Sequence, residues 1–345
     1  MKMKTLITSL FPVLVIRFVT AIDLDPFPHV ESSFEIYTID KGNELNACMM
    51  HSDLVSSLQK NGFTKVVCPF GILLFATDEY PDNLLKYGAN IIANMIDADN
   101  DGLPDNPDVK NALAHLGRYS EGYALVCGTS SSEERQEEHI KGLKYTFSCQ
   151  TWKGESDNDS EKAIMFEEAF HMMNSGWADI YPDIFGFDSF EDSLICRETA
   201  RLQCVRPGWW HPENTCPVGA PFSPGSSFVS SPLSPGAGDC TEPSCDCAEF
   251  YRQAMTLYMD WDDLPFWYSE YMPRTKNEFK AMASDELLAM MADPQYNQPQ
   301  VALSGIYTSN VLPLDVPSSA HSSALTLIVV SISCLYTYFW IHINI

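Results

Sequence analysis

The sequence predicts an α+β, helix-rich fold in a single domain stapled by disulfides. Hydrophobic residues make up 45% of the 345 residues and charged residues 19%, which is typical of a globular rather than a disordered chain. Segments with the apolar spacing of helices outnumber the short apolar runs that favour strands. The chain also carries 11 cysteines, and their number suits an oxidising compartment.

The chain is strongly acidic. It has 21 Lys and Arg against 46 Asp and Glu, which gives a net charge of −25. Nucleic acid and anionic lipid surfaces are therefore disfavoured as partners, because binding to phosphate requires clustered basic side chains. An acidic chain of this kind suits cation binding and solubility outside the cell.

Residues 1–21 are typical of a secretory signal peptide. Two lysines near the start precede an apolar run at 5–16. Val19 and Ala21 fit the small-residue cleavage pattern, so the mature chain should begin at Ile22. The alternative is a buried N-terminal helix. Cleavage would leave an extracellular domain that extends to about residue 316.

Residues 317–345 predict attachment to a membrane. The stretch 324–345 contains no Asp, Glu, Lys or Arg, and as a helix it would be about 33 Å long, enough to cross a bilayer core. Small residues including Ser318 lie just upstream, which suits a GPI-attachment signal whose tail is removed. A retained transmembrane span is the alternative. In either case we expect the protein at the cell surface, with a protein or glycan partner that the sequence leaves unknown.

The cysteines outside the tail predict up to five disulfides of unknown connectivity. They are Cys48, Cys68, Cys127, Cys149, Cys196, Cys204, Cys216, Cys240, Cys245 and Cys247. The segment 196–247 is rich in cysteine and contains an uncharged Pro/Ser/Gly loop at 217–238, which we interpret as a loop insertion. The sequon at Asn158 predicts glycosylation on a surface loop.

The first half of the chain shows both strand and helix signals. The apolar run 66–77 predicts one or two buried strands broken at Pro69 and Gly71. Residues 82–96 have apolar side chains at helical spacing. Further elements are expected as a helix at 108–116 and a strand at 124–126.

The second half is predicted to be mainly helical. Residues 129–161 are polar and acidic, and we expect a surface excursion there. A strong helix follows at 161–174, with Gly176 as its stop signal. Apolar spacing predicts further helices at 248–259 and 276–291.

The motif with the clearest chemistry is the loop 97–108, which reads DADNDGLPDNPD. Carboxylates occupy loop positions 1, 3, 5, 9 and 12, Gly102 stands where the chain must turn sharply, and a carbonyl is offered at position 7. A hard cation such as Ca²⁺ takes six to eight oxygen ligands, and this spacing wraps them around one point. Predicted helices flank the loop, so the sequence predicts a helix–loop–helix over residues 81–117. The candidate ligands are Asp97, Asp99, Asp101, Asp105, Asp108 and the carbonyl of Leu103.

This loop resembles those of the EF-hand family, and its spacing is also similar to the calcium loops of thrombospondin type 3 repeats. The resemblance implies a bound Ca²⁺, with Asp105 acting directly or through water. Pro104 lacks an N–H to pair with a partner loop, and the sequence contains no second loop of this kind. We therefore expect structural calcium rather than a sensor. The alternative is an acidic turn without an ion.

A second constellation lies at 167–171. Glu167 and Glu168 precede His171 by four and three residues, so all three share one face of a helix. The pattern resembles the H-E-x-x-H helix of zincins with Glu in place of the first His. The resemblance implies Zn²⁺ or another transition metal, with Glu167 and His171 as ligands and Glu168 as general base. Glu249, on another predicted helix, is the candidate third ligand.

Other interpretations of this helix remain open. An acidic helix with a hydrogen-bonded His is the simplest, and the sequence alone favours it; a carboxylate-bridged di-metal bundle is another. Three functions follow, in order of preference: a calcium-binding cell-surface protein, a metal-dependent hydrolase, and an adhesion or matrix protein without catalysis. The aromatic patch at 209–211 can stack on carbohydrate or simply pack.

Overall fold

The computed structural model describes residues 32–39, 48–115, 121–129, 140–151, 158–187, 193–203, 243–261 and 275–309. Within them the chain forms a mixed sheet accompanied by many helices, so the predicted α+β, helix-rich class is confirmed. Among these residues, no helix combines the length and the apolar character needed to cross a bilayer.

The sheet has five strands in the order β1-β2-β3-β4-β5. The pairs β1–β2 and β2–β3 are antiparallel, whereas β3–β4 and β4–β5 are parallel. Parallel neighbours need a long crossover, and two helices provide it between β3 and β4. The strands are β1 (Tyr37–Thr38), β2 (Lys65–Val67), β3 (Leu73–Ala76), β4 (Tyr123–Thr129) and β5 (Tyr145–Thr151).

The helices fall into two groups along the chain. The first group packs on the sheet and contains α1 (Ser52–Lys60), the short 3₁₀ helix η1 (Pro69–Gly71), α2 (Asp82–Ile96), α3 (Pro107–Leu113) and α5 (Asn158–Ile180). The second group contains α6 (Pro182–Phe185), α7 (Leu194–Gln203), α8 (Pro243–Tyr258), α9 (Lys276–Met282) and α10 (Asp285–Ala292).

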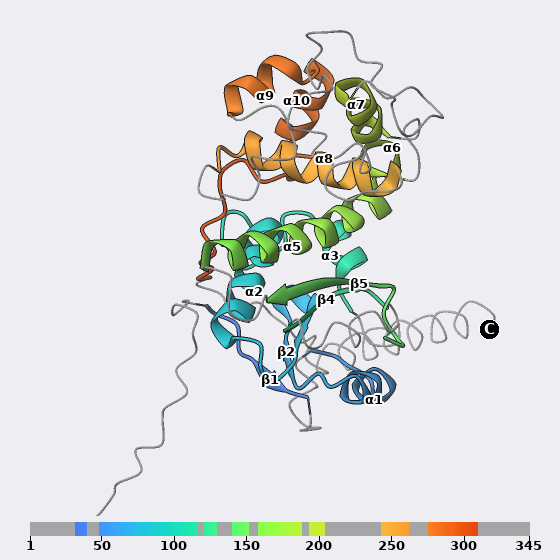
Figure 1. Ribbon diagram of the computed structural model, residues 1–345, viewed down its shortest axis with the longest axis vertical. Helices are drawn as coiled ribbons and strands as arrows, with labels where there is room; N and C mark the ends of the chain where they lie inside the picture. Colours follow the sequence, from blue (N-terminus) through green and yellow to red (C-terminus); the bar gives the residue numbers. More distant parts are fainter. Residues whose placement is uncertain are drawn as a thin grey trace, which may run out of the picture.

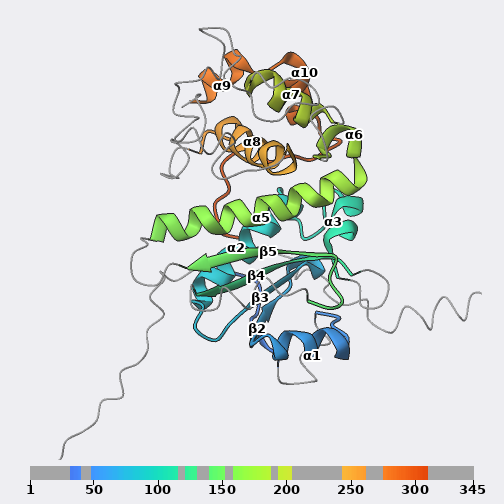
Figure 2. The ribbon, with the colours of Figure 1, turned by 45° about the vertical axis from the view of Figure 1, so that its right-hand side comes forward.

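The molecule is layered around α5. Helix α1 covers one face of the sheet, and α2, α3 and α5 cover the other (Figure 1). Helix α8 lies on the side of α5 away from the sheet, with α7, α9 and α10 beyond it (Figure 2). Alternating strand residues supply the two apolar clusters that fill these layers: Leu73 and Phe75 face α1, whereas Leu74 and Ala76 face the α2–α5 side. Helix α5 is thus buried between the sheet and the second group.

Several predicted elements are confirmed. The apolar run 66–77 contains β3 and all of β2 except its first residue, Lys65; η1 separates the two strands, where Pro69 and Gly71 break the run. Helix α2 has the predicted bounds, and β4 contains the predicted strand 124–126. Helix α3 ends at Leu113, before the predicted end at 116.

Four local predictions are wrong. The excursion 129–161 contains β5, and the sequon residue Asn158 begins α5 rather than lying in a loop. Gly176 does not stop α5, which runs on to Ile180; the glycine instead lets α3 approach, because a Cβ there would lie 2.5 Å from Leu113 Cγ. The helix predicted at 276–291 is two helices, because the Ser284 hydroxyl caps α10 by accepting from Leu287 N at 3.0 Å.

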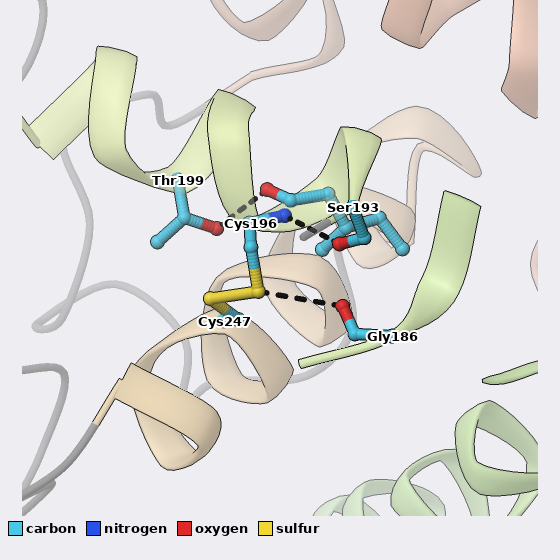
Figure 3. Close-up of a disulfide and its surroundings, with 6 residues drawn as sticks. Gly186, Ser193, Cys196, Thr199 and Cys247 are labelled. Carbon is cyan, nitrogen blue, oxygen red and sulfur yellow. Dashed lines mark hydrogen bonds between the residues drawn. A yellow bond between two sulfur atoms is a disulfide. The ribbon is translucent and has the colours of Figure 1, made fainter. Parts of the chain in front are cut away.

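Disulfides tie the chain together in both halves. Cys48 pairs with Cys68, and Cys196 of α7 pairs with Cys247 of α8 (Figure 3). Cys245 is also disulfide-bonded. Cys127 and Cys149, in-register partners on β4 and β5, are free thiols buried in the core. The maximum of five disulfides expected from the sequence is therefore too high.

Other predictions concern residues outside the described ones. They are the signal peptide 1–21, the loop 217–238, Cys204, Cys216, Cys240, the aromatic patch 209–211, and the attachment segment 317–345 with Ser318.

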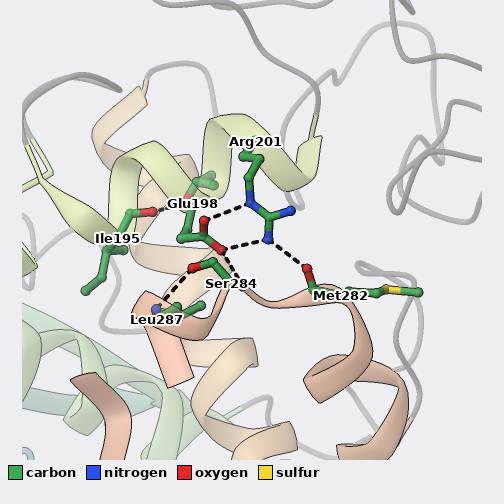
Figure 4. Close-up of polar contacts among 7 residues, drawn as sticks. Ile195, Glu198, Arg201, Met282, Ser284 and Leu287 are labelled. Carbon is green, nitrogen blue, oxygen red and sulfur yellow. Dashed lines mark hydrogen bonds and ion pairs between the residues drawn. The ribbon is translucent and has the colours of Figure 1, made fainter. Parts of the chain in front are cut away.

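An ion pair between the buried Glu198 and the exposed Arg201 joins α7 to the link between α9 and α10. Arg201 Nε and Nη2 each donate to the Glu198 carboxylate at 2.8 Å, and Ser284 N donates to the same carboxylate at 3.2 Å (Figure 4). Arg201 Nη2 also donates to Met282 O at 2.7 Å. Burial would raise the pKa of Glu198, but the hydrogen bonds from Arg201 and Ser284 outweigh it and lower the pKa below its ordinary value of 4.5.

Replacing Glu198 with Gln should therefore reduce the dependence of stability on acid pH. Because the folded-state pKa is lowered, the stabilisation is complete above about 4.5 and is lost as pH falls through the folded pKa. Glu198→Gln should lower the free energy of unfolding near neutral pH by about 1–3 kcal/mol and flatten the acid limb. Urea unfolding at neutral and acid pH measures both effects; an equal acid loss in the two proteins would contradict the assignment.

Candidate metal centres

Helix α5 carries polar groups along a stripe between its two packed faces. Phe166 and Phe170 pack on each other, and Phe170 reaches Tyr251 of α8. Met165, on the opposite side of the helix, contacts Cys149 of the sheet. Between these faces, Glu167 and His171 recur at i and i+4 and share one side of the helix.

Helix α8 brings Glu249 to this stripe. The disulfide from Cys196 to Cys247 fixes the first turns of α8 against α7, with a Cα–Cα distance of 5.1 Å (Figure 3). Glu249 follows two residues later, on the part of α8 that packs on α5. The disulfide therefore restrains the carboxylate in relation to the helix that faces it.

Glu167, His171 and Glu249 converge on one point. Each offers one ligand atom, and these three atoms lie within 4.8 Å of one another. His171 Nε2 is 3.0 Å from Glu249 Oε1. Neighbouring ligand atoms around a tetrahedral zinc ion are separated by about 3.3 Å, so the spacing suits ligands of one ion. The side chains of Glu167, His171 and Glu249 are 26%, 11% and 21% exposed, so solvent reaches the site.

The imidazole of His171 is paired with this carboxylate on one side only. Nε2 lies at ion-pair distance from Glu249 Oε1, 3.0 Å, whereas Nδ1 has no hydrogen-bond partner among the described residues. An ion held by the carboxylates would take the place of the proton on Nε2. The donor set of one imidazole and two carboxylates fits zinc, manganese or iron.

Arg252 completes the cluster. It lies one turn beyond Glu249 on α8 and is 2% exposed. Its Nη2 and Nε lie 2.7 and 2.8 Å from Glu249 Oε2, and its Nε lies 3.3 Å from Glu167 Oε1. The guanidinium thus bridges two carboxylates that come from different helices.

Electrostatics at the site shift three pKa values. Burial raises the pKa of Glu168 to about 7, with His171 opposing and Glu167 adding to the shift. Burial alone would lower the pKa of His171, but Glu249 raises it to about 9. Burial is likewise outweighed at Glu249, whose pKa is held well below its usual range by Arg252 and His171. Without an ion, Glu249 is therefore charged and His171 carries a proton at neutral pH, so binding a metal through Nε2 would release that proton.

One further polar group lies on the same stripe. Asn174 follows His171 by three residues and is fully buried, and both polar atoms of its amide lack a hydrogen-bond partner among the described residues. An unsatisfied buried amide is costly. Asn174 therefore adds an unpartnered polar group one turn beyond His171 on α5.

The acidic loop between α2 and α3 forms a second cluster. Asp97, Asp99 and Asp105 each place one carboxylate oxygen within 4.8 Å of the others. Asp97 is fully buried at the C-terminal end of α2, and its oxygens accept from Gly102 N at 2.8 Å and Asp101 N at 3.1 Å. Gly102 has a φ of +89°, which allows the sharp turn that this position requires.

A residue from the end of the described chain holds Asp97. The hydroxyl of Tyr307 donates to Asp97 Oδ2. Tyr307 is fully buried, and its ring stacks on Phe34 at 5.4 Å. Burial raises the pKa of Asp97, although the hydrogen bonds from Tyr307 and Gly102 oppose that shift. The loop is therefore anchored to the segment that ends at residue 309.

The other residues predicted for this loop lie outside the group. Asp101 Oδ1 accepts from Leu103 N at 2.7 Å, in a local turn. Asp108 is exposed in the first turn of α3. The side chain of Leu103 is 61% exposed.

Sequence reasoning missed Arg252, Asn174 and Tyr307. Arg252 had a signal, because it stands three residues after the predicted ligand Glu249 and basic residues at that spacing pair with carboxylates. Asn174 stands at i+7 from Glu167, on the same face. Tyr307 had no local signal, since it lies 210 residues from Asp97 in the chain.

The chain matches no protein-family model, curated protein or solved structure.

Proposed function

We propose that the chain is a metal-dependent hydrolase whose metal is held by Glu167, His171 and Glu249. The observation that carries this proposal is the meeting of Glu249 with His171 across the α5–α8 interface. The two residues are far apart in the chain. A pair of His171 with Glu249 alone would not require Glu167, whose ligand atom reaches the same point.

The residues at the site have distinct proposed roles. When bound, the metal supplies a Lewis acid that polarises a carbonyl group. Glu168 precedes His171 by one turn, retains some exposure to solvent, and has a pKa of about 7. A carboxylate of that pKa can take up a proton at neutral pH, which suits a general base. The resemblance of the motif to a zincin helix favours peptides as substrates.

Metal analysis tests this proposal directly. The full chain, purified from a eukaryotic secretory host, should carry one equivalent of zinc, manganese or iron by plasma mass spectrometry. The loaded protein should cleave fluorogenic peptides, lose that activity to a strong chelator and regain it with the same metal. A preparation that neither retains nor takes up a stoichiometric transition metal would reduce the cluster to a structural ion pair.

We also propose a structural calcium ion in the loop 97–108, in an EF-hand-like helix–loop–helix. The specific observation is the convergence of Asp97, Asp99 and Asp105 between α2 and α3. Three carboxylates so close together repel one another unless a cation is bound.

The charge of the chain and its disulfides support secretion and a cell-surface location, with a GPI anchor or a single span. Adhesion without catalysis remains the alternative if the transition metal is absent.

A further inference from the structure

Arg252 pairs with two of the three candidate metal ligands, Glu167 and Glu249. The hydrolase proposal, on which this inference rests, places a carboxylate at the first ligand position of the helix instead of an imidazole. The structure places a buried guanidinium beside that carboxylate, with Arg252 Nε 3.3 Å from Glu167 Oε1. The same guanidinium binds Glu249 by two atoms, at 2.7 and 2.8 Å.

The two oxygens of Glu249 have separate partners. Oε1 lies 3.0 Å from His171 Nε2, on the side of the converging ligands. Oε2 faces Arg252. A ligand carboxylate commonly uses one oxygen for the metal while a neighbouring group holds the other, and such supporting groups fix the direction of the ligand. Arg252 therefore has the geometry of a positioning residue for Glu249.

Net charge explains why an arginine belongs there. Two imidazoles and one carboxylate around a divalent ion leave a centre with one positive charge, as in the His₂Glu sites of known zinc hydrolases. One imidazole and two carboxylates leave it neutral, and the guanidinium of Arg252 restores one positive charge. Glu168 has its counterpart in the H-E-x-x-H motif, so it does not change this comparison.

We propose that Arg252 compensates for Glu167, giving the Glu/His/Glu centre the net charge of a His/His/Glu zinc site. Glu167 and Arg252 then form one functional unit. A carboxylate at position 167 requires the arginine, because without it two half-buried carboxylates lose a charged hydrogen-bond donor. With an imidazole at position 167, the arginine would hold Glu249 alone and would have no second carboxylate to neutralise.

The inference predicts that one substitution has effects of different size in two backgrounds. Zinc affinity is measured by competition with a chromophoric chelator for the full chain and for Arg252→Gln, Glu167→His and the double variant. Arg252→Gln should weaken zinc binding to the wild-type chain by about 10- to 100-fold. Added to Glu167→His, the same change should weaken binding clearly less, because the arginine then holds Glu249 but has no second carboxylate to neutralise.

Control variants distinguish failure of the charge-compensation inference from failure of the hydrolase proposal. Arg252→Lys keeps the positive charge and should lose less affinity than Arg252→Gln. Thermal unfolding in excess chelator identifies any variant that does not fold, and the comparison is made among folded variants. If Arg252→Gln weakens zinc binding by the same factor in both backgrounds, charge compensation is wrong although the metal site stands. If the wild-type chain binds no zinc, manganese or iron, the hydrolase proposal itself fails.

Discussion

Replacing Glu168 with Gln is expected to slow peptide hydrolysis by about 10²- to 10⁴-fold, the usual contribution of a general base, while the metal content stays the same. Glutamine has nearly the shape of glutamate but cannot take up a proton at neutral pH. Glu168 is not among the three residues whose ligand atoms converge, so its replacement should leave the metal in place. Rate and metal content are measured on the same preparation.

The matched comparison is His171→Gln, one turn further along α5. This variant removes the only imidazole of the converging group and should lose both the metal and the activity. The two variants therefore separate proton transfer from metal binding. Loss of metal from Glu168→Gln would make Glu168 a ligand, and an unchanged rate would remove it from the chemistry.

Local rules predicted the elements whose signals lie within a few residues. Helix α2 was found with its bounds because its apolar spacing is regular. The period-2 pattern of β5, in which Tyr145, Phe147 and Cys149 alternate with polar residues, was present in the sequence but was obscured by its polar surroundings. Gly176 illustrates the opposite case, because only the packing of Leu113 shows why a glycine continues a helix there.

For the candidate site as well, some features could be predicted from local sequence and others depend on tertiary packing. The relation of Glu167 to His171 follows from helix geometry alone, whereas the position of Glu249 depends on the packing of α8 on α5. The charge role of Arg252 could not be inferred from sequence, since it requires knowing that Glu167 and Glu249 approach the same guanidinium. Patterns within a few residues identify candidate ligands, and only tertiary packing determines which of their side chains lie close together.

Removing calcium is expected to destabilise the fold strongly. A ligand at a hundredfold excess over its Kd stabilises the native state by about 2.7 kcal/mol, which corresponds to a fall in Tm of several degrees on chelation. The physical reason is the repulsion among Asp97, Asp99 and Asp105, whose oxygens lie within 4.8 Å of one another. Calorimetric scans with millimolar calcium and with EGTA measure the shift.

The variant that isolates this effect is Asp99→Asn combined with Asp105→Asn. Both side chains are exposed, so the change removes ligand charge without opening the core, unlike a change at Asp97. The variant should lose the calcium-dependent part of Tm and the heat of calcium binding in titration calorimetry. The matched control is Asp183→Asn, an exposed aspartate of α6 outside the loop, which should retain both.

The contacts of Asp97 and of α2 predict which residues become less protected from hydrogen exchange when calcium is removed. Asp97 is bound by Tyr307, and Asn90 and Asn94 of α2 donate to the carbonyls of Gly305 and Ile306 at 2.9 and 3.1 Å. Hydrogen exchange on chelation should therefore increase in the loop and also in residues 303–309, although these are remote in sequence. Equal calcium heats in the loop variant and the wild type would instead mean that the aspartates form an acidic turn that binds no ion.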